Sequence, residues 1–100
     1  MTNYTIRVEL HGADENDYEA LHTAMQAEGF VRWIKDQDGN KLRLPTAEYN
    51  LPDSELTRVQ VLGLTKRAAE TAKARPTPWI LVTQSGGRTW SGLKAWNPKG

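Results

Sequence analysis

Strict alternation of apolar and polar residues marks the start of the chain. The eight residues that alternate are, in order, Tyr4, Thr5, Ile6, Arg7, Val8, Glu9, Leu10 and His11. A period of two places alternate side chains on opposite faces of a β-strand. The pattern therefore predicts a half-buried strand over residues 4–11. Its polar row is either solvated surface or the floor of a site.

A helical pattern follows this strand. Asp14 is the expected N-cap, because its short acidic side chain can accept a hydrogen bond from the first turn. The residues at helical spacing are Tyr18, Leu21, His22 and Met25. Gly29 suits the left-handed position that ends many helices, and Phe30 would supply the apolar contact beyond it. We expect one amphipathic helix between these two signals.

Residues 30–35 and 41–51 predict two strands joined by a turn that contains Asp-Gly. The second strand changes parity at Pro45, because the apolar residues before and after it are Leu42, Leu44, Ala47, Tyr49 and Leu51. A bulge at Pro45 and Thr46 would reconcile the two halves. We expect one long bent strand, paired first with the hairpin and then with the first strand.

Residues 56–74 predict a second helix that is capped by Asp53 or Ser54. Its broad apolar side comprises Val61, Leu62, Leu64, Ala68, Ala69 and Ala72. Gly63 inside the helix indicates close packing against the sheet. Residues 79–83 then predict a strand with apolar side chains on both faces, and residues 89–96 an optional further strand.

The expected order of elements is β-α-β-β-α-β, with a possible extra C-terminal strand. Two helices on one face of an antiparallel sheet make the ferredoxin-like arrangement of the α+β class. One hundred residues fit a single domain. We expect its core to cover about residues 4–96 and its short C-terminal tail, residues 96–100, to fray.

Composition restricts the function classes. A net charge of +1 gives no global attraction to nucleic acid or membrane, so any basic site must be a local patch. The absence of cysteine excludes disulfides, thiol catalysis and cysteine-ligated zinc. Neither a secretory signal nor an apolar run of roughly 18 residues is present. We expect a cytoplasmic protein that does not contact membranes.

No metal or cofactor motif is evident in the sequence. The two histidines lie on different predicted elements. Asp36, Asp38 and Asn40 resemble the start of a calcium loop, but the glutamate of its twelfth position is missing, so we interpret them as the hairpin turn. Residues 85–87 are glycine-rich but lack the following helix that a phosphate cradle needs. We therefore expect a flexible turn there, with no metal and no small-molecule cofactor.

Candidate catalytic chemistry lies on the polar row of the first strand. His11 and Glu9 are the candidate proton-transfer residues, since histidine titrates near neutral pH, and Arg7 can hold a phosphate beside them. The alternative is a cross-strand ladder of charges on an open surface. His22 lies near the apolar face of its helix, where a core or boundary role is the simpler interpretation.

Local clusters of cations and aromatics suggest a binding surface. The candidate nucleic-acid-binding residues are Arg7, Arg32, Arg43 and Arg88. Four tryptophans in one hundred residues exceed what a small core needs. They can stack on unpaired bases, or they can form a dimer interface, in which tryptophan is enriched.

The segments YTIRVELHGADENDYEALHTAMQAEGF, LPTAEYN and SGGRTW, in this order, resemble the GhoS-like family of small bacterial proteins. The resemblance covers about residues 4–90. It implies a ferredoxin-like fold, similar to that of CRISPR-associated nucleases, and a homodimer. It also implies cleavage of a toxin's messenger RNA, as in type V toxin–antitoxin systems. Active nucleases of the similar fold hold a metal with an aspartate at the end of the first strand, where this chain has Glu9-Leu10-His11.

We therefore expect an RNA-interacting protein of antitoxin type, for which endoribonuclease activity rests on the resemblance alone. The alternative is a non-catalytic dimeric module that binds nucleic acid or a protein partner, of plasmid, phage or other origin. Phosphate contacts would make binding weaken steeply with ionic strength, whereas an apolar protein interface would not.

Overall fold

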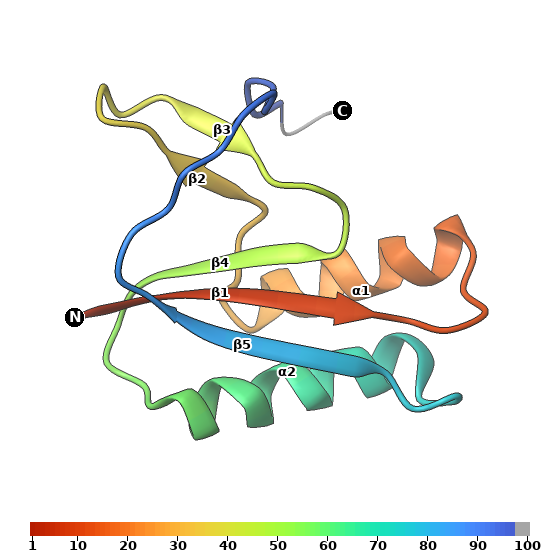
Figure 1. Ribbon diagram of the computed structural model, residues 1–100. Coiled ribbons are helices and arrows are strands. Elements are labelled where there is room, and N and C mark those ends of the chain that lie inside the picture. The colour runs from red at the N-terminus through yellow and green to blue at the C-terminus, as the bar shows by residue number, and fades with distance from the viewer. Residues whose placement is uncertain (98–100) are drawn as a thin grey trace.

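The computed structural model describes residues 1–97, which contain five strands and two helices (Figure 1). In chain order they are β1 (Thr2–Glu9), α1 (Glu15–Ala27), β2 (Trp33–Lys35), β3 (Lys41–Arg43), β4 (Glu48–Ser54), α2 (Arg58–Lys73) and β5 (Trp79–Ser85). Neither helix within residues 1–97 is long and apolar enough to cross a membrane.

β1 is the central strand of an antiparallel three-stranded sheet with the order β4-β1-β5. Its predicted apolar residues Tyr4, Ile6 and Val8 are buried. The pairing of β1 with β4 agrees with the prediction that residues after Pro45 pair with the first strand. It ends at Glu9 rather than at His11, because the chain turns toward α1 there.

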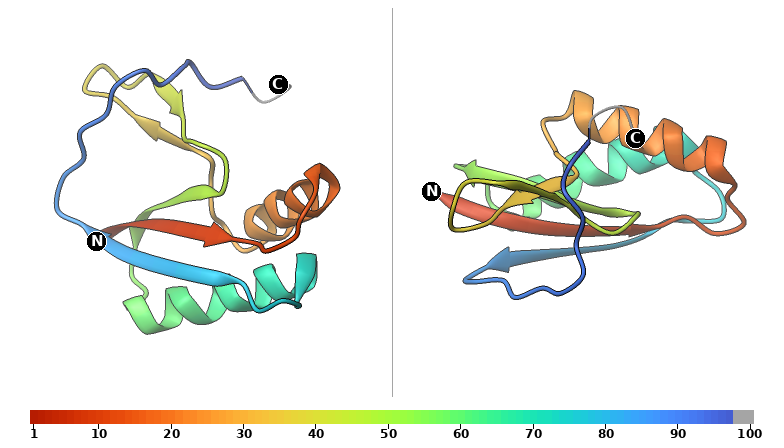
Figure 2. Two further views of the ribbon diagram at one scale, coloured as in Figure 1. Left: turned by 45° about the vertical axis from the view of Figure 1, so that its right-hand side comes forward. Right: turned by 90° about the horizontal axis from the view of Figure 1, so that it is seen from above.

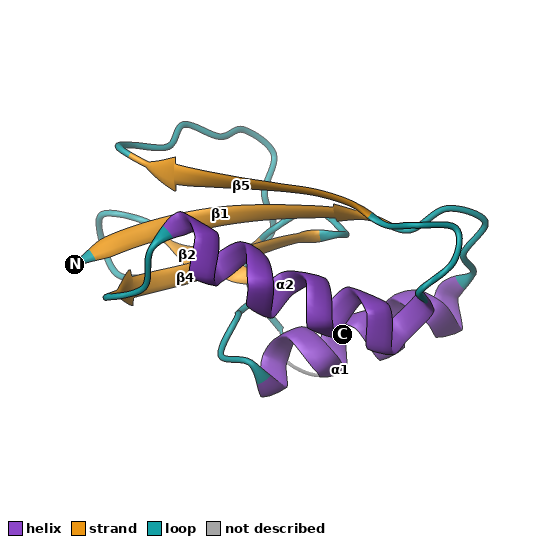
Figure 3. Ribbon diagram, turned by 90° about the horizontal axis from the view of Figure 1, so that it is seen from below, coloured by secondary structure: helices purple, strands orange, loops and turns teal. Residues whose placement is uncertain are grey.

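Both helices cover the same face of this sheet, as two further views show (Figures 2 and 3). Leu21 and Met25 from α1 meet Val61 and Ala69 from α2 in the core, and all four are fully buried. The α+β class and the placement of both helices on one face are confirmed. The opposite face of the sheet carries the polar row of β1.

The predicted ends of α1 are confirmed in detail. Asp14 is the N-cap and forms a reciprocal capping box with Asp17. At the other end, Gly29 has a φ of 95°, and the N–H of Phe30 donates to the carbonyl of Met25 over 3.0 Å. This left-handed ending fixes the direction in which the chain leaves α1 toward the hairpin.

The long bent strand predicted over residues 41–51 is wrong, because the chain breaks into β3 and β4. Ala47 between them has a φ of 72°, a left-handed conformation outside the β region, and it interrupts the strand at this point. β2 and β3 form a separate two-stranded sheet. An isolated bridge between Val31 and Asn50 links the start of this hairpin to β4.

The second helix begins later than predicted, because residues 52–54 continue β4. Thr57 is the N-cap, and its hydroxyl accepts a hydrogen bond from the N–H of Gln60. The apolar side of α2 is also narrower than predicted. Leu62 is exposed, and a Cβ on Gly63 would meet nothing within 4 Å, so this glycine does not mark close packing.

Residues 89–96 do not form the optional further strand. A single bridge joins Leu42 to Ala95, and the N–H of Trp96 donates to the carbonyl of Lys41 over 3.0 Å. The C-terminal segment therefore lies against β3 (Figure 2). Of the tail for which we predict fraying, residues 98–100 lie outside the described residues.

Candidate functional site

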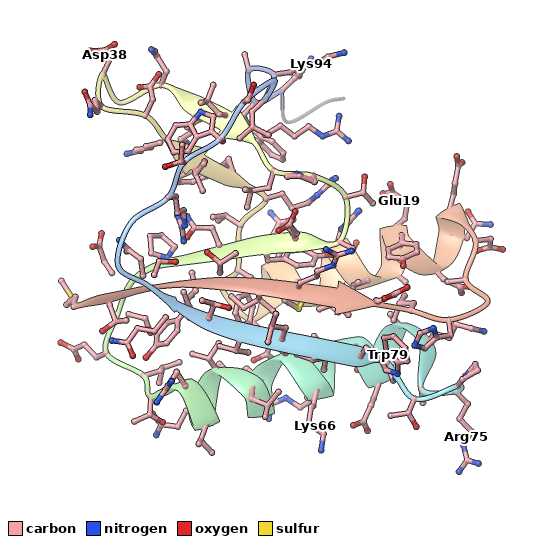
Figure 4. The ribbon with its side chains drawn as sticks, in the orientation of Figure 1. Glu19, Asp38, Lys66, Arg75, Trp79 and Lys94 are labelled. Carbon is pink, nitrogen blue, oxygen red and sulfur yellow. The ribbon has the colours of Figure 1, made fainter. Side chains whose placement is uncertain are left out.

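An open cavity of about 990 Å³ lies between α1, the hairpin and the loop that joins β3 to β4. Its lining includes Glu19 and His22 from α1, Arg32 from the approach to the hairpin, Arg43 from β3 and Thr46 from the loop. Figure 4 shows the side chain of Glu19 on the side of α1 that faces this loop. Two arginines, a histidine and the carboxylate of Glu19 thus converge from three parts of the chain.

Backbone pairing at the open end of the hairpin holds the two arginines near each other. Trp33 pairs with Arg43 across β2 and β3. The carbonyl of Arg32 accepts a hydrogen bond from the N–H of Leu44 over 2.8 Å. Because each arginine precedes or belongs to a paired strand, its Cα is fixed by the hairpin and not by a mobile loop.

The guanidinium of Arg32 is incompletely satisfied. Its Nε is buried and has no hydrogen-bond partner within residues 1–97. Burial lowers the pKa of Arg32 from its ordinary value, and the charge of Arg43 lowers it further, against smaller opposing effects of Tyr49 and Glu19. Two partly desolvated cations repel each other, so an anion in the cavity would stabilise the pair.

His22, which lines the cavity, is held by a hydrogen bond to Tyr49 in the core. Nδ1 of His22 lies 2.6 Å from the hydroxyl of Tyr49, which is fully buried. Burial, together with the charge of Arg32, lowers the pKa of His22 to about 4, so the imidazole is neutral at pH 7. Burial also raises the pKa of Tyr49, so its hydroxyl keeps its proton.

A second, smaller cavity of about 270 Å³ adjoins the first. The two cavities share Glu19, His22 and Arg32 in their linings. The smaller one is also lined by Trp33 from β2 and Trp96 from the C-terminal segment. A cationic site therefore continues directly into an aromatic one.

The structure brings together only part of the predicted site. Arg32 and Arg43 line the larger cavity, whereas Arg7, Glu9 and His11 line neither of the two. The ring of His11 instead packs edge-on against Trp79, with 4.5 Å between ring centroids. Figure 4 shows Trp79 at the start of β5, beside the end of β1.

Arg88 lies elsewhere and is bound to the sheet. Its Nε donates to the hydroxyl of Thr5 over 3.0 Å, and one terminal nitrogen donates to the carbonyl of Tyr4 and to Oδ1 of Asn50. Burial lowers the pKa of Arg88. In this structure Arg88 ties the segment after β5 to β1 and β4.

Glu19 and His22 line the site although the sequence does not predict them there, and Tyr49 acts only as the buried hydrogen-bond partner of His22. His22 is correctly placed at the boundary of the helix face, and that position gave no reason to prefer it over His11. The sequence feature that could have indicated this contact is the alternation within β4. Because the strand begins at Glu48, Tyr49 is buried on the side of α1. No local motif joins residues 19, 22, 32, 43 and 49.

The arrangement can bind an anion and an adjacent aromatic group. Within residues 1–97 there is no group of three or more histidine, aspartate or glutamate side chains that could hold a metal ion. Comparison of the chain with protein-family models, with curated proteins and with solved structures finds no match.

Proposed function

We propose that this protein binds single-stranded RNA and that Arg32 and Arg43 hold a backbone phosphate in the larger cavity. The observation that carries the proposal is their convergence on one cavity, with Nε of Arg32 left without a partner in the described chain. Guanidinium groups match phosphate in geometry, because their N–H donors can pair with two oxygens at once.

Charge and shape favour a short unpaired segment over a duplex. The net charge of +1 does not supply a long cationic track along a nucleic acid. Asp14, Glu15 and Glu19 line the same cavity and would repel phosphates beyond the arginine pair. Unpaired bases can turn into a cavity, and this is how single-stranded RNA is usually recognised.

The proposal agrees with a GhoS-like, antitoxin-type protein of ferredoxin-like fold. Its support is the central position of β1, the antiparallel strands on both sides and two helices on one face. The bridge between Val31 and Asn50 would add the fourth strand position beside β4. The resemblance of the sequence segments supplies the antitoxin role.

If bound RNA is also cleaved, a proton acceptor must lie beside the phosphate. His22 is neutral at pH 7 and lines the same cavity as both arginines. Glu9 and His11, the candidates from the sequence, line neither cavity, so RNA would have to extend beyond both linings to reach them. The rates of RNA cleavage by the His22→Gln and His11→Gln variants show which histidine accepts the proton. If both variants cleave RNA at the wild-type rate, neither histidine is catalytic.

A dimeric binding module is the second candidate, favoured by an exposed apolar strip on β5. Trp79 is 67% exposed and Leu81 is 63% exposed, on an edge strand that no described strand covers on its outer side. Large exposed apolar side chains on a sheet edge mark an association surface. Light scattering tests this candidate: Leu81→Arg converts a wild-type dimer into a monomer, and a monomeric wild type removes it.

Anisotropy of a labelled RNA oligonucleotide tests the main proposal. We expect the wild-type protein to bind single-stranded RNA more tightly than duplex DNA of the same length, and the affinity to fall as salt is raised. Absence of RNA binding at low salt, or an affinity that does not respond to salt, would overturn the proposal.

A further inference from the structure

The smaller cavity has the size and lining of a pocket for one planar ring system. Its volume of about 270 Å³ lies just below the range of roughly 300–1,000 Å³ for sites of drug-sized ligands. It therefore suits a single ring system better than a whole nucleotide. Trp33, Trp96 and the buried Phe30 are among its lining residues, so much of the lining is aromatic.

We propose that this cavity is a nucleobase subsite, in which one unpaired base of the RNA stacks on Trp96 while the adjoining phosphate lies on Arg32 and Arg43. This inference rests on the RNA-binding function proposed above. The shared lining of the two cavities carries it, because a base and its neighbouring phosphate must occupy connected spaces.

Trp96 is the better stacking partner of the two tryptophans. The ring of Trp33 already carries the ammonium group of Lys41, whose Nζ lies 4.4 Å from the ring centroid. No ring or ammonium group of the described chain packs on the indole of Trp96 in this way. The N–H of Trp96 donates to the carbonyl of Lys41, so its backbone is fixed beside the cavity.

The nature of the site also defines the ligand. A base that stacks in the smaller cavity must be unpaired, because a base within a nucleic-acid double helix has both ring faces covered by its neighbours. Stacking does not depend strongly on base identity, since every base has a ring face. We therefore expect recognition of single-stranded RNA with weak sequence preference at this position.

Two probes separate the base subsite from the phosphate site: a single-stranded RNA oligonucleotide and a base-free ribose-phosphate oligomer of equal length. Trp96→Ala should weaken binding of the RNA by roughly 5- to 150-fold, the effect of losing one stacked base. It should leave the weaker binding of the base-free oligomer unchanged. Trp96→Phe should retain most of the RNA affinity, and Trp90→Ala, which removes an exposed tryptophan outside both cavities, should match wild type.

Arg32→Ala distinguishes failure of the subsite from failure of the proposed function. If Trp96→Ala binds RNA as wild type does, or if wild type binds both probes equally, the subsite is overturned. In that case, weaker binding of both probes by Arg32→Ala would still support the phosphate site. If Arg32→Ala leaves the affinities for both probes unchanged, the proposed binding of a phosphate by Arg32 is contradicted. Thermal melts show whether each variant is folded. If Trp96→Ala does not fold, the comparison of the two probes on wild type still tests the subsite.

Discussion

Nδ1 of His22 lies 2.6 Å from the hydroxyl of Tyr49, so that a residue of α1 that lines the larger cavity shares a hydrogen bond with a residue of β4. The bond satisfies a hydroxyl on a fully buried side chain. It also holds the imidazole beside Arg32, whose charge helps to keep His22 neutral. The same contact therefore contributes both to the packing of α1 and to the electrostatics of the site.

Stability should fall as the pH is lowered through the range from 6.5 to about 4, because His22 has its pKa lowered across that range in the folded protein. Between these values the unfolded chain binds more protons than the folded one, so the free energy of unfolding rises with pH. After allowance for the partial exposure of His22, we expect a loss of roughly 1–2 kcal/mol. Urea unfolding at a series of pH values measures it.

His22→Gln is the matched control for this titration, because an amide does not titrate and can still bond to Tyr49. The difference between the wild-type and variant curves isolates His22 from His11 and the carboxylates. Parallel curves between pH 4 and pH 7 would show that the pKa of His22 is not lowered in the folded protein.

Glu19→Gln should tighten RNA binding. Glu19 lines both cavities, and its negative charge opposes a phosphate held by Arg32 and Arg43. Removing one charge at an exposed position should raise the affinity about 2- to 10-fold at low salt, with a smaller gain at high salt. Glu70→Gln on α2 is the control outside both cavities. Weaker RNA binding by the Glu19 variant would indicate that this carboxylate contacts the ligand directly.

Arg88→Ala should destabilise the fold rather than weaken RNA binding directly. It removes the hydrogen bonds to Thr5, Tyr4 and Asn50, and leaves the amide oxygen of buried Asn50 without this donor. We expect a loss of about 2 kcal/mol in the free energy of unfolding. Arg7→Ala, an exposed change on the same face, should stay within about 0.5 kcal/mol of wild type. Unchanged stability with weakened RNA binding would return Arg88 to the role that the sequence suggests.

Sequence patterns correctly predicted the features that depend on interactions between residues close together in the chain. Alternation identified β1, and the capping signals at Asp14 and Gly29 identified the ends of α1. Two predicted features were wrong, namely the continuous strand through Pro45 and the helix cap at Asp53 or Ser54. The apolar residues on the two sides of Pro45 are separated by a left-handed Ala47 and a strand break. Asp53 belongs to β4, where it lies at an irregularity in the pairing with β1 and its N–H donates to Oδ1 of Asn3.

The candidate site was only half predictable, because it is assembled by tertiary structure. Arg32 and Arg43 were evident as cations, but their proximity depends on hairpin pairing that brings residues 11 positions apart together. The neutral state of His22 follows from burial, which no sequence pattern shows. Arg7, Glu9 and His11 are easy to find in the sequence because they alternate within one short segment. Such a pattern does not by itself indicate a functional site.

The salt dependence of RNA affinity for wild type, Arg32→Ala, Arg43→Ala and the double variant tests the central claim most directly. Each arginine that contacts a phosphate should contribute about one unit to the slope of log affinity against log salt, and its removal should weaken binding at all sequences alike. Arg58→Ala, an exposed change in the first turn of α2, is the matched control. We predict a reduced slope for each single variant, a further reduction for the double variant and a wild-type slope for the control. Wild-type affinity and slope in the folded double variant would contradict the account.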